Sequence, residues 1–145
     1  MKLAILCGMP LSGKTTYGRM LQSQGWVRVS VDDLRLALHG KGFMEEAEKD
    51  VWASAELMVR TLLLSGHQVI VDTTNRTRER RQRWIRVAEE FGIPLEIHHV
   101  DTDLEICLAR NKALRRLPEA ALRYIFMEYE KPSPEEGEII QVNRQ

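Results

Sequence analysis

The chain of 145 residues has the length of one domain, and its 43% hydrophobic and 29% charged residues are ordinary for a soluble globular protein. Lysine plus arginine and aspartate plus glutamate each number 21, so the formal net charge is zero. This balance excludes a basic field over the whole chain that would hold nucleic acid non-specifically, so any nucleic-acid site must be a local patch.

Strand and helix patterns alternate through the first half of the chain. A short apolar run at residues 3–7 is typical of a strand buried on both faces. The other elements expected in this half are a helix at 14–22, a strand at 27–31, a short helical turn at 34–38 and a long helix at 45–65. In the long helix, apolar residues recur near the 3.6-residue period of an amphipathic helix.

The second half of the chain continues the alternation. Its expected elements are a strand at 67–71, an arginine-rich helix at 77–91, a strand at 95–100, a helix that opens at 104–110, a helix from 118 to 129 and a strand at 139–142. Five strands interleaved with helices predict an α/β fold, a three-layer sandwich with a five-stranded parallel sheet. No repeat, low-complexity run or linker divides the sequence, so residues 1–145 are expected to form a single domain.

The loops after Cys7, Val31 and Val71 are the candidate site elements, because parallel α/β sheets bind ligands beyond the carboxyl ends of their strands. The first loop matches the pattern G-x-x-x-x-G-K-[ST] in full, with the residues Gly8, Met9, Pro10, Leu11, Ser12, Gly13, Lys14 and Thr15. A chance glycine-rich turn is the alternative. The buried strand before the loop and the helix after it favour a nucleotide-binding loop.

Each part of this loop suits a nucleoside triphosphate. Consecutive backbone N–H groups form a cradle for anions, and the glycines let the backbone approach phosphate oxygens. The helix after the loop directs the positive end of its dipole at the same phosphates. Lys14 is expected to reach the β- and γ-phosphates and the Thr15 hydroxyl to bind Mg²⁺, with Thr16 beside it in the same site. The loop therefore predicts ATP and Mg²⁺ as ligands.

Acidic and basic side chains follow the second strand. Asp32 and Asp33 come directly after it, and Arg35 lies two residues beyond Asp33. A kinase needs a carboxylate near the acceptor hydroxyl to take its proton, and an arginine beside the transferring phosphoryl group holds negative charge. Aspartate is also a common helix N-cap. We therefore assign Asp32 to the acceptor and Asp33 to the cap.

Asp72 ends the third strand, where an acid in P-loop proteins often holds the water shell of Mg²⁺. Thr73, Thr74 and Asn75 follow it and are candidates for hydrogen bonds to substrate or phosphate. The same residue types are ordinary in a turn at the end of a strand, which is the alternative. The sequence thus predicts a second magnesium-binding residue with substrate-binding neighbours.

Six arginines lie within eleven residues at the next helix: Arg76, Arg78, Arg80, Arg81, Arg83 and Arg86. Arginine suits planar contacts with phosphate, and positions 76, 80 and 83 share one helical face. Such a charge run is more often a solvated face, and glutamates of the same helix are available to pair with it. A local path for a charged polymer, with Arg76 binding substrate, is the alternative interpretation.

A second basic segment, with Arg110, Lys112, Arg115 and Arg116, lies between two predicted helices. A mobile lid at 110–117 would close over ATP, add positive charge at the phosphates and exclude the water that hydrolyses ATP. A solvated connection between helices is the alternative. We favour the lid, and the pattern leaves open which of its arginines enters the site.

The patterns of cysteine and histidine residues favour structural roles. Cys7 and Cys107 lie in apolar stretches without metal-ligand spacing, which is typical of reduced, buried thiols in a cytoplasmic protein. His98 and His99 lie in a predicted strand. No apolar run approaches the ~18 residues of a membrane span, and a strand that begins at Lys2 leaves no room for a signal peptide. We therefore expect a cytoplasmic protein without membrane contact.

Together these residues resemble the P-loop kinases of the polynucleotide 5′-hydroxyl kinase type. The segments that carry the resemblance are GMPLSGKTT at 8–16, VDDLR at 31–35, VIVDTTNRTRERR at 69–81, LARNKALRR at 108–116 and KPSPEEGEII at 131–140.

The resemblance implies a P-loop NTPase fold, with Lys14 and Thr15 serving ATP and magnesium. It implies that Asp32 is the general base and that Arg35 contacts the acceptor phosphate. Arg110 and one of Arg115 or Arg116 would then act from the lid. Many relatives carry a phosphatase or ligase domain, whereas this chain has no D-x-D-G-T motif, so we expect a stand-alone kinase.

The leading hypothesis is an ATP-dependent kinase of single-stranded DNA or RNA ends. The same scaffold serves kinases of sugars, nucleosides or antibiotics, and the fold does not separate these. A stacking aromatic residue would favour nucleic acid, and Trp26, Phe43, Trp52 and Trp84 are the candidates. A non-catalytic nucleotide-binding switch is the third hypothesis. The acid and arginine after the second strand argue against it, because a switch has no use for an acceptor-side base.

Overall fold

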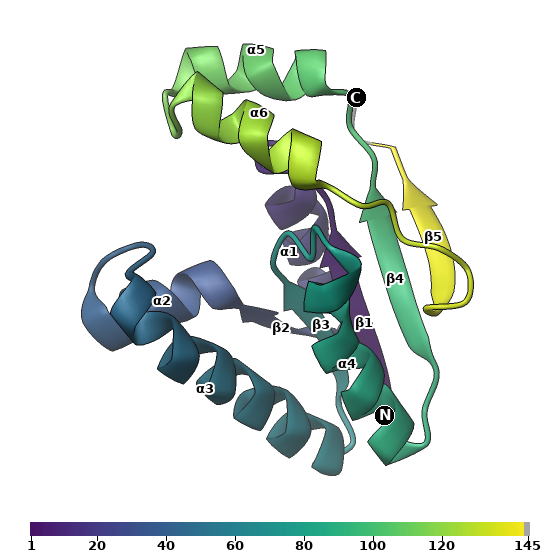
Figure 1. Ribbon diagram of the computed structural model, residues 1–145. Coiled ribbons are helices and arrows are strands. Elements are labelled where there is room, and N and C mark those ends of the chain that lie inside the picture. The colour runs from purple at the N-terminus through teal and green to yellow at the C-terminus, as the bar shows by residue number, and fades with distance from the viewer. Residues whose placement is uncertain (144–145) are drawn as a thin grey trace.

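The computed structural model describes residues 1–143, which form a five-stranded parallel sheet flanked by helices (Figure 1). The strands are β1 (Lys2–Cys7), β2 (Val27–Ser30), β3 (Gln68–Asp72), β4 (Leu95–Val100) and β5 (Glu138–Val142), in the spatial order β2-β3-β1-β4-β5. In this register Ile5 lies beside Val71 on one side and Ile97 on the other. The predicted five-stranded parallel sheet is confirmed.

Helices cover both faces of the sheet. They are α1 (Lys14–Ser23), α2 (Val31–His39), α3 (Glu45–Leu64), α4 (Arg78–Phe91), α5 (Leu104–Leu114) and α6 (Glu119–Glu128). Successive side chains of a strand point to opposite faces. Leu3 and Ile5 therefore pack in the cluster with α3 and α4, whereas Ala4 and Leu6 pack in the cluster with α1. The result is the predicted three-layer sandwich.

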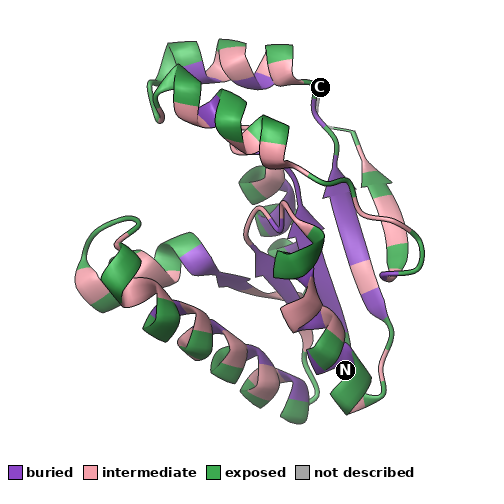
Figure 2. Ribbon diagram, in the orientation of Figure 1, coloured by how far each residue is buried: buried purple, intermediate pink, exposed green. Residues whose placement is uncertain are grey.

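Burial follows from this layering (Figure 2). Strand β1 is buried from Leu3 to Cys7, because helices cover both of its faces and strands cover both of its edges. Burying a large apolar side chain completely contributes roughly 1.5–3 kcal/mol, so a strand of this kind is strongly held. The first site loop thus leaves the sheet from its most firmly packed strand.

Helix α2 is longer than the short turn expected at 34–38. It begins at Val31, because the Ser30 hydroxyl caps it by accepting a hydrogen bond from the Asp33 backbone N–H (3.2 Å). The assignment of Asp33 as the cap is therefore wrong. Asp32 and Asp33 both lie in the first helical turn, where the helix dipole favours negative charge.

The segment at 110–117, expected to be a loop, is largely helical. Helix α5 continues through Arg110, so that only residues 115–118 connect it to α6. The Asn111 side chain holds this turn, since its amide donates to the Leu117 carbonyl oxygen (2.9 Å) and accepts from the Leu117 N–H (3.0 Å). The expected loop is thus corrected to a helical hairpin, which stands beyond the carboxyl end of β4 (Figure 1). Closure of this segment over ATP stays a prediction.

Two smaller expectations, for the cysteines and for the histidines, are confirmed. Cys7 and Cys107 are buried free thiols, as expected. His98 and His99 lie in β4, as expected. Within residues 1–143, no helix combines the length and the apolar character that a bilayer crossing requires.

Candidate active site

The loop from Gly8 to Thr15 is fixed at its entry by close packing. The Gly8 N–H donates to the Thr74 carbonyl oxygen (3.0 Å), which joins this loop to the segment after β3. A Cβ atom at Gly8 would lie only 2.8 Å from the Val100 carbonyl oxygen. The first glycine of the pattern is therefore needed for this close approach to β4.

Side chains from other elements hold two carbonyl groups of the loop. The Thr102 hydroxyl donates to the Ser12 carbonyl oxygen (2.8 Å), and Arg110 Nη1 donates to the Leu11 carbonyl oxygen (2.9 Å). Leu11 (φ 68°) and Gly13 (φ 96°) occupy the left-handed region, as a tight anion-binding loop requires. The N–H groups of Gly8 and Ser12 are engaged within the protein, and the loop can present its other N–H groups to an anion.

Helix α1 begins without a cap. Gly13 stands at its N-cap position and supplies no side-chain hydrogen bond, and the first turn contains no acidic residue. The first N–H groups of a helix need partners, and the helix dipole favours a negative one. Within residues 1–143, the buried Ser12 hydroxyl also has no hydrogen-bond partner. These donors fit the phosphates of a nucleoside triphosphate.

A cavity of about 550 Å³ opens beside this helix start, a size that suits a nucleotide. Its lining includes residues 14–16 of α1, Arg110 of α5 and Arg116 of the connection between α5 and α6. Arg115 ends α5 in the left-handed region (φ 51°) and is not among the lining residues. Of the two lid arginines that the resemblance left open, Arg116 is the one that faces the cavity.

Asp32 is exposed and is held in place by a chain of contacts. Its side chain is 88% exposed, and its Oδ1 accepts a hydrogen bond from Arg35 Nη1 (2.7 Å). Arg35 is bound in turn by both carboxylate oxygens of Glu48 in α3, with Nη2 donating to Oε1 (2.6 Å) and Nε donating to Oε2 (2.9 Å). Trp52 donates to the same carboxylate (3.2 Å). Asp32 thus presents an oriented, accessible carboxylate, as a proton acceptor requires.

The Arg35–Glu48 pair anchors this series of contacts. Hydrogen bonding to Glu48 raises the pKa of Arg35, and hydrogen bonding to Arg35 lowers the pKa of Glu48. Both side chains are largely buried, at 13% and 16% exposure, so solvent screens this pair less than a surface pair. Glu48 therefore keeps Arg35 oriented.

Asp72 is buried and paired with Arg28 of β2. Its Oδ2 accepts from Arg28 Nε (2.8 Å) and lies 2.7 Å from Nη2. Arg28 also contacts the exposed Asp33 (3.1 Å). The role of Asp72 in the water shell of Mg²⁺ stays a prediction, and any such role must coexist with the Arg28 contact.

A magnesium ion at this site would need ligands from the substrate phosphates as well as from the protein. Within residues 1–143, no group of three or more His, Cys, Asp or Glu side chains converges as a metal site. Mg²⁺ is commonly bound by one or two protein groups together with substrate phosphates and water. Thr15 in the first turn of α1 and Asp72 at the end of β3 fit that pattern.

The residues after Asp72 brace the loop. Thr73 and Thr74 are half-buried, and the Thr74 carbonyl oxygen binds the start of the first loop. Asn75 is buried in the left-handed region (φ 46°), and its amide donates to the Leu6 carbonyl oxygen (2.6 Å). These contacts explain Asn75 as a structural residue, and substrate contacts of the three residues stay predictions.

Glutamates from other elements engage most of the arginine run. The pairs are Arg76–Glu128 (2.7 Å), Arg78–Glu135, Arg81–Glu136 (2.7 Å) and Arg83–Glu56 (2.8 Å). None of these glutamates belongs to α4, so the pairing expected within the helix does not describe them. Arg76, predicted to bind substrate, instead joins the start of α4 to α6 in this structure.

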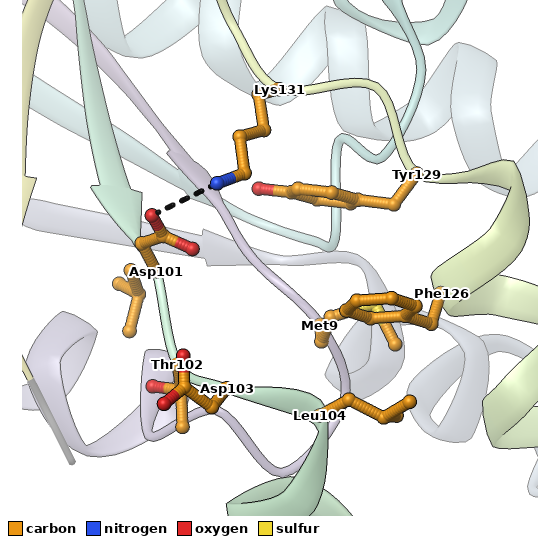
Figure 3. A pocket seen from close by; sticks show the side chains of 9 residues that line it. Met9, Asp101, Thr102, Asp103, Leu104, Phe126, Tyr129 and Lys131 are labelled. Carbon is orange, nitrogen blue, oxygen red and sulfur yellow. Dashed lines mark hydrogen bonds and ion pairs between the residues drawn. The ribbon is translucent and has the colours of Figure 1, made fainter.

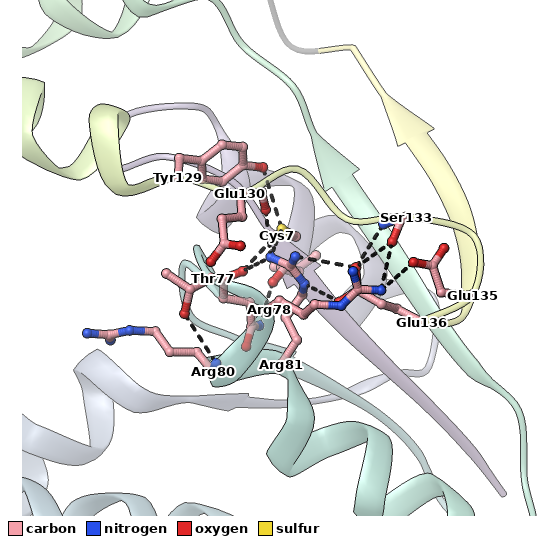
Figure 4. A network of polar contacts seen from close by, with 12 residues as sticks. Cys7, Thr77, Arg78, Arg80, Arg81, Tyr129, Glu130, Ser133, Glu135 and Glu136 are labelled. Carbon is pink, nitrogen blue, oxygen red and sulfur yellow. Dashed lines mark hydrogen bonds and ion pairs between the residues drawn. The ribbon is translucent and has the colours of Figure 1, made fainter.

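Arg81 is fully buried and joins three segments of the chain (Figure 4). Its Nε donates to Glu136 Oε1 (2.7 Å), and its Nη1 donates to the carbonyl oxygens of Asn75 and Glu130 (both 2.8 Å). Cys7 lies in the same network, and burial raises the pKa of its thiol. This cluster is a structural support behind the first loop, and its thiol stays protonated at neutral pH.

A second cavity of about 220 Å³ lies between the end of β4 and α6 (Figure 3). Met9 and Phe126 contribute apolar walls, and the Asp101–Lys131 ion pair (3.5 Å) closes another side. Met9 is the P-loop residue that lines this cavity, whereas Lys14 lines the larger one. The larger cavity is therefore the better candidate for the triphosphate.

Sequence reasoning did not identify two charged residues of the site, Glu48 and Arg28. Glu48 lies in the first turn of α3, where the helix dipole alone explains an acid. For Arg28, the available signal was a charge within the apolar alternation of β2. The four candidate stacking residues also differ in their exposure to solvent. Trp84 is fully buried, whereas Phe43 is 70% exposed.

Comparisons with known proteins agree on a kinase fold. A family model described as an AAA domain matches residues 3–132 of the chain. The bifunctional polynucleotide phosphatase/kinase of Schizosaccharomyces pombe is 29% identical over 143 residues, covering 94% of this chain and 31% of the relative.

Solved structures give the same picture. A chain of the Pnkp1/Rnl/Hen1 RNA repair complex is 27% identical with a TM-score of 0.77, covering 88% of this chain and 43% of its own length. The chain thus spans less than half the length of either relative. The APS kinase CysC of Mycobacterium tuberculosis, in complex with AMPPNP and APS, shares the fold at 21% identity with a TM-score of 0.72, covering 98% of this chain and 88% of its own.

Proposed function

The chain belongs to the AAA domain family as a P-loop kinase domain, and from this we propose that it transfers the γ-phosphoryl group of ATP to the 5′-hydroxyl of a DNA or RNA end. The names of the Schizosaccharomyces pombe phosphatase/kinase and of the RNA repair complex favour a polynucleotide acceptor. The observation that carries the proposal is the accessible Asp32 carboxylate, which Arg35 and Glu48 orient beyond the same edge of the sheet as the uncapped start of α1.

The nucleotide end of the site acts through backbone donors and cations. The first N–H groups of α1 and the loop amides bind phosphate oxygens, and Lys14 and Arg116 add positive charge from the cavity wall. When bound, Mg²⁺ neutralises phosphate charge, with Thr15 and Asp72 as the residues that would hold it or its water shell. These groups stabilise the negative charge on the phosphate oxygens more strongly in the transition state than in the ground state.

The acceptor end supplies the base. The acceptor oxygen attacks the γ-phosphorus in line, a new oxygen–phosphorus bond forms, and the bond from the γ-phosphorus to the β–γ bridging oxygen breaks. That electron pair leaves on ADP, and the hydroxyl proton moves to Asp32. Arg35 holds one oxygen of Asp32, so the carboxylate can turn its other oxygen to the acceptor without losing its position.

The test measures transfer of labelled γ-phosphate with Mg²⁺ to a 5′-hydroxyl oligonucleotide and, separately, to nucleosides and sugars. We expect label in the oligonucleotide. Asp32→Asn should lower kcat by about 10²–10⁴-fold, the usual contribution of general-base catalysis, with little change in KM for ATP. Asp50→Asn is the matched control and should keep full activity, because Asp50 is also an exposed aspartate but lies in α3.

Two results would contradict the proposal. Label only in a nucleoside or sugar would select a small-molecule kinase on the same fold. ATP binding without transfer to any acceptor would select a nucleotide-binding switch.

A further inference from the structure

Of the six arginines of the run, Arg80 and Arg86 form no ion pair within residues 1–143, and Arg80 is the one that lies among paired arginines. Its neighbours Arg76, Arg78, Arg81 and Arg83 each form an ion pair with a glutamate. Among residues 1–143, no carboxylate lies within ion-pair distance of the exposed Arg80. Figure 4 shows its side chain extending away from the network around Arg81.

Two ion pairs, Arg76–Glu128 and Arg35–Glu48, act electrostatically on Arg80. The charges that act on it are those of Arg76 and Glu128 and those of Arg35 and Glu48, with Arg76 the strongest. Each of the two carboxylates already accepts a hydrogen bond from its own arginine, at 2.7 Å for Glu128 and 2.6 Å for Glu48. Arg80 therefore completes a group of three arginines whose nearby acids are engaged.

This environment disfavours the positive charge of Arg80. Partial loss of hydration, followed by the charge of Arg76, lowers the pKa of Arg80. The group remains protonated at neutral pH, because an arginine ordinarily titrates above about 12. An anion that reached Arg80 would offset both effects, and the planar guanidinium group suits phosphate in particular.

An exposed aromatic ring lies near the same group of arginines. Tyr124 of α6 is 62% exposed, and after Arg76 it also contributes to lowering the pKa of Glu128, the partner of Arg76. Arginines beside an exposed aromatic ring match single-stranded nucleic acid, in which phosphates alternate with bases that can stack. A phosphorylated sugar would use the arginines and leave the ring without a partner.

We propose that Arg80, together with Arg76, binds a backbone phosphate of the acceptor strand, and that Tyr124 stacks on one of its bases. This inference rests on the proposed function, since it states how that function's acceptor is held. Arg80 then determines specificity, because an acceptor with a phosphodiester or 3′-phosphate gains a contact that a free nucleoside lacks. The contact lies away from the transferring group, so it changes KM and leaves kcat nearly unchanged.

The experiment compares the unmodified protein with Arg80→Gln, Arg80→Lys and the control Arg86→Gln, an exposed arginine on the same helix. The acceptors are a 5′-hydroxyl oligonucleotide, a nucleoside 3′-monophosphate, a nucleoside and a phosphorylated sugar. In Arg80→Gln, KM for the two phosphate-bearing nucleic-acid acceptors should rise about tenfold, from loss of a charged hydrogen bond. KM for ATP and for the nucleoside should stay unchanged, and Arg80→Lys should recover part of the loss.

Salt dependence gives a second readout that a structural role would not produce. The slope of log KM for the oligonucleotide against log salt concentration should fall by about 0.7 in Arg80→Gln, the value for one phosphate contact on a single strand. Tyr124→Ala should raise KM for the oligonucleotide several-fold and leave the nucleoside unaffected, and Tyr124→Phe should retain the ring and the affinity.

The outcomes separate the two proposals. If the unmodified protein labels oligonucleotides and Arg80→Gln has unchanged KM and salt slope, this inference is wrong and the proposed function stands. A KM effect confined to the phosphorylated sugar would overturn the nucleic-acid assignment of the subsite. If the unmodified protein labels no nucleic acid at all, the proposed function fails and this inference fails with it.

Discussion

The orientation of Asp32 comes from residues outside its own helix. Arg35 lies one turn further along α2 and would be a flexible side chain by itself. Glu48 and Trp52 of α3 fix it, so the geometry of the expected base depends on how α2 and α3 pack. An ion pair in this position contributes more to stability than a surface ion pair, because both partners are largely buried.

Replacing Glu48 tests this dependence. Glu48→Gln should lower the free energy of unfolding at pH 7 by about 1–3 kcal/mol, the range for a hydrogen bond to a charged group. The folded-state pKa of Glu48 is lowered, so its stabilisation is present above the ordinary glutamate pKa of about 4.3 and is lost as pH falls through the folded value. The difference between the proteins in urea unfolding should therefore shrink between pH 7 and pH 3.

Glu46→Gln, at an exposed residue of the same helical turn, is the control and should show little difference at either pH. A Glu48→Gln effect of equal size at both pH values would show that the ionised pair is not the source of the stabilisation.

The edge strand β5 is held to the rest of the fold by the buried Arg81–Glu136 pair. Arg81 lies in α4, and Glu136 lies just before β5. The strand itself has no fully buried residue, so its apolar contacts are limited. The ion pair and the Arg81 contact with the Glu130 carbonyl oxygen therefore position this segment.

Arg81→Met should destabilise the protein by about 3–5 kcal/mol, because it leaves the Glu136 carboxylate buried without its partner. Hydrogen exchange at the β5 amides should accelerate more than at β1. The matched control is Arg78→Met, which breaks the exposed pair with Glu135 and should cost no more than about 1 kcal/mol. Equal losses in the two variants would mean that burial of the Arg81 pair is unimportant.

Across the whole molecule, the sheet could be predicted from the sequence, whereas the ion pairs between distant segments could not. Apolar runs and helical periodicity are local signals, so the five strands and their parallel arrangement could be predicted. The P-loop was also readable, because its pattern is contiguous. Arg81 and Glu136 lie 55 positions apart, however, and no local pattern links them.

The same limit applies to the site. Asp32 and Arg35 could be predicted because they follow a strand end. Glu48 could not, because only the packing of α3 against α2 brings it to Arg35. The cap at Ser30 was missed because a serine at a strand end also suits a turn. Composition marked the arginine run, but only the fold separates the four arginines with glutamate partners from Arg80 and Arg86.

The proposed kinase activity depends on binding of a triphosphate by the loop and the uncapped start of α1. Isothermal titration calorimetry with ATP at millimolar Mg²⁺, at two temperatures, measures this directly. We expect one binding site per chain, with affinity reduced at least about tenfold in Lys14→Ala through loss of a charged hydrogen bond to phosphate. Folded protein that gives no heat with either ATP or GTP at both temperatures would contradict the account.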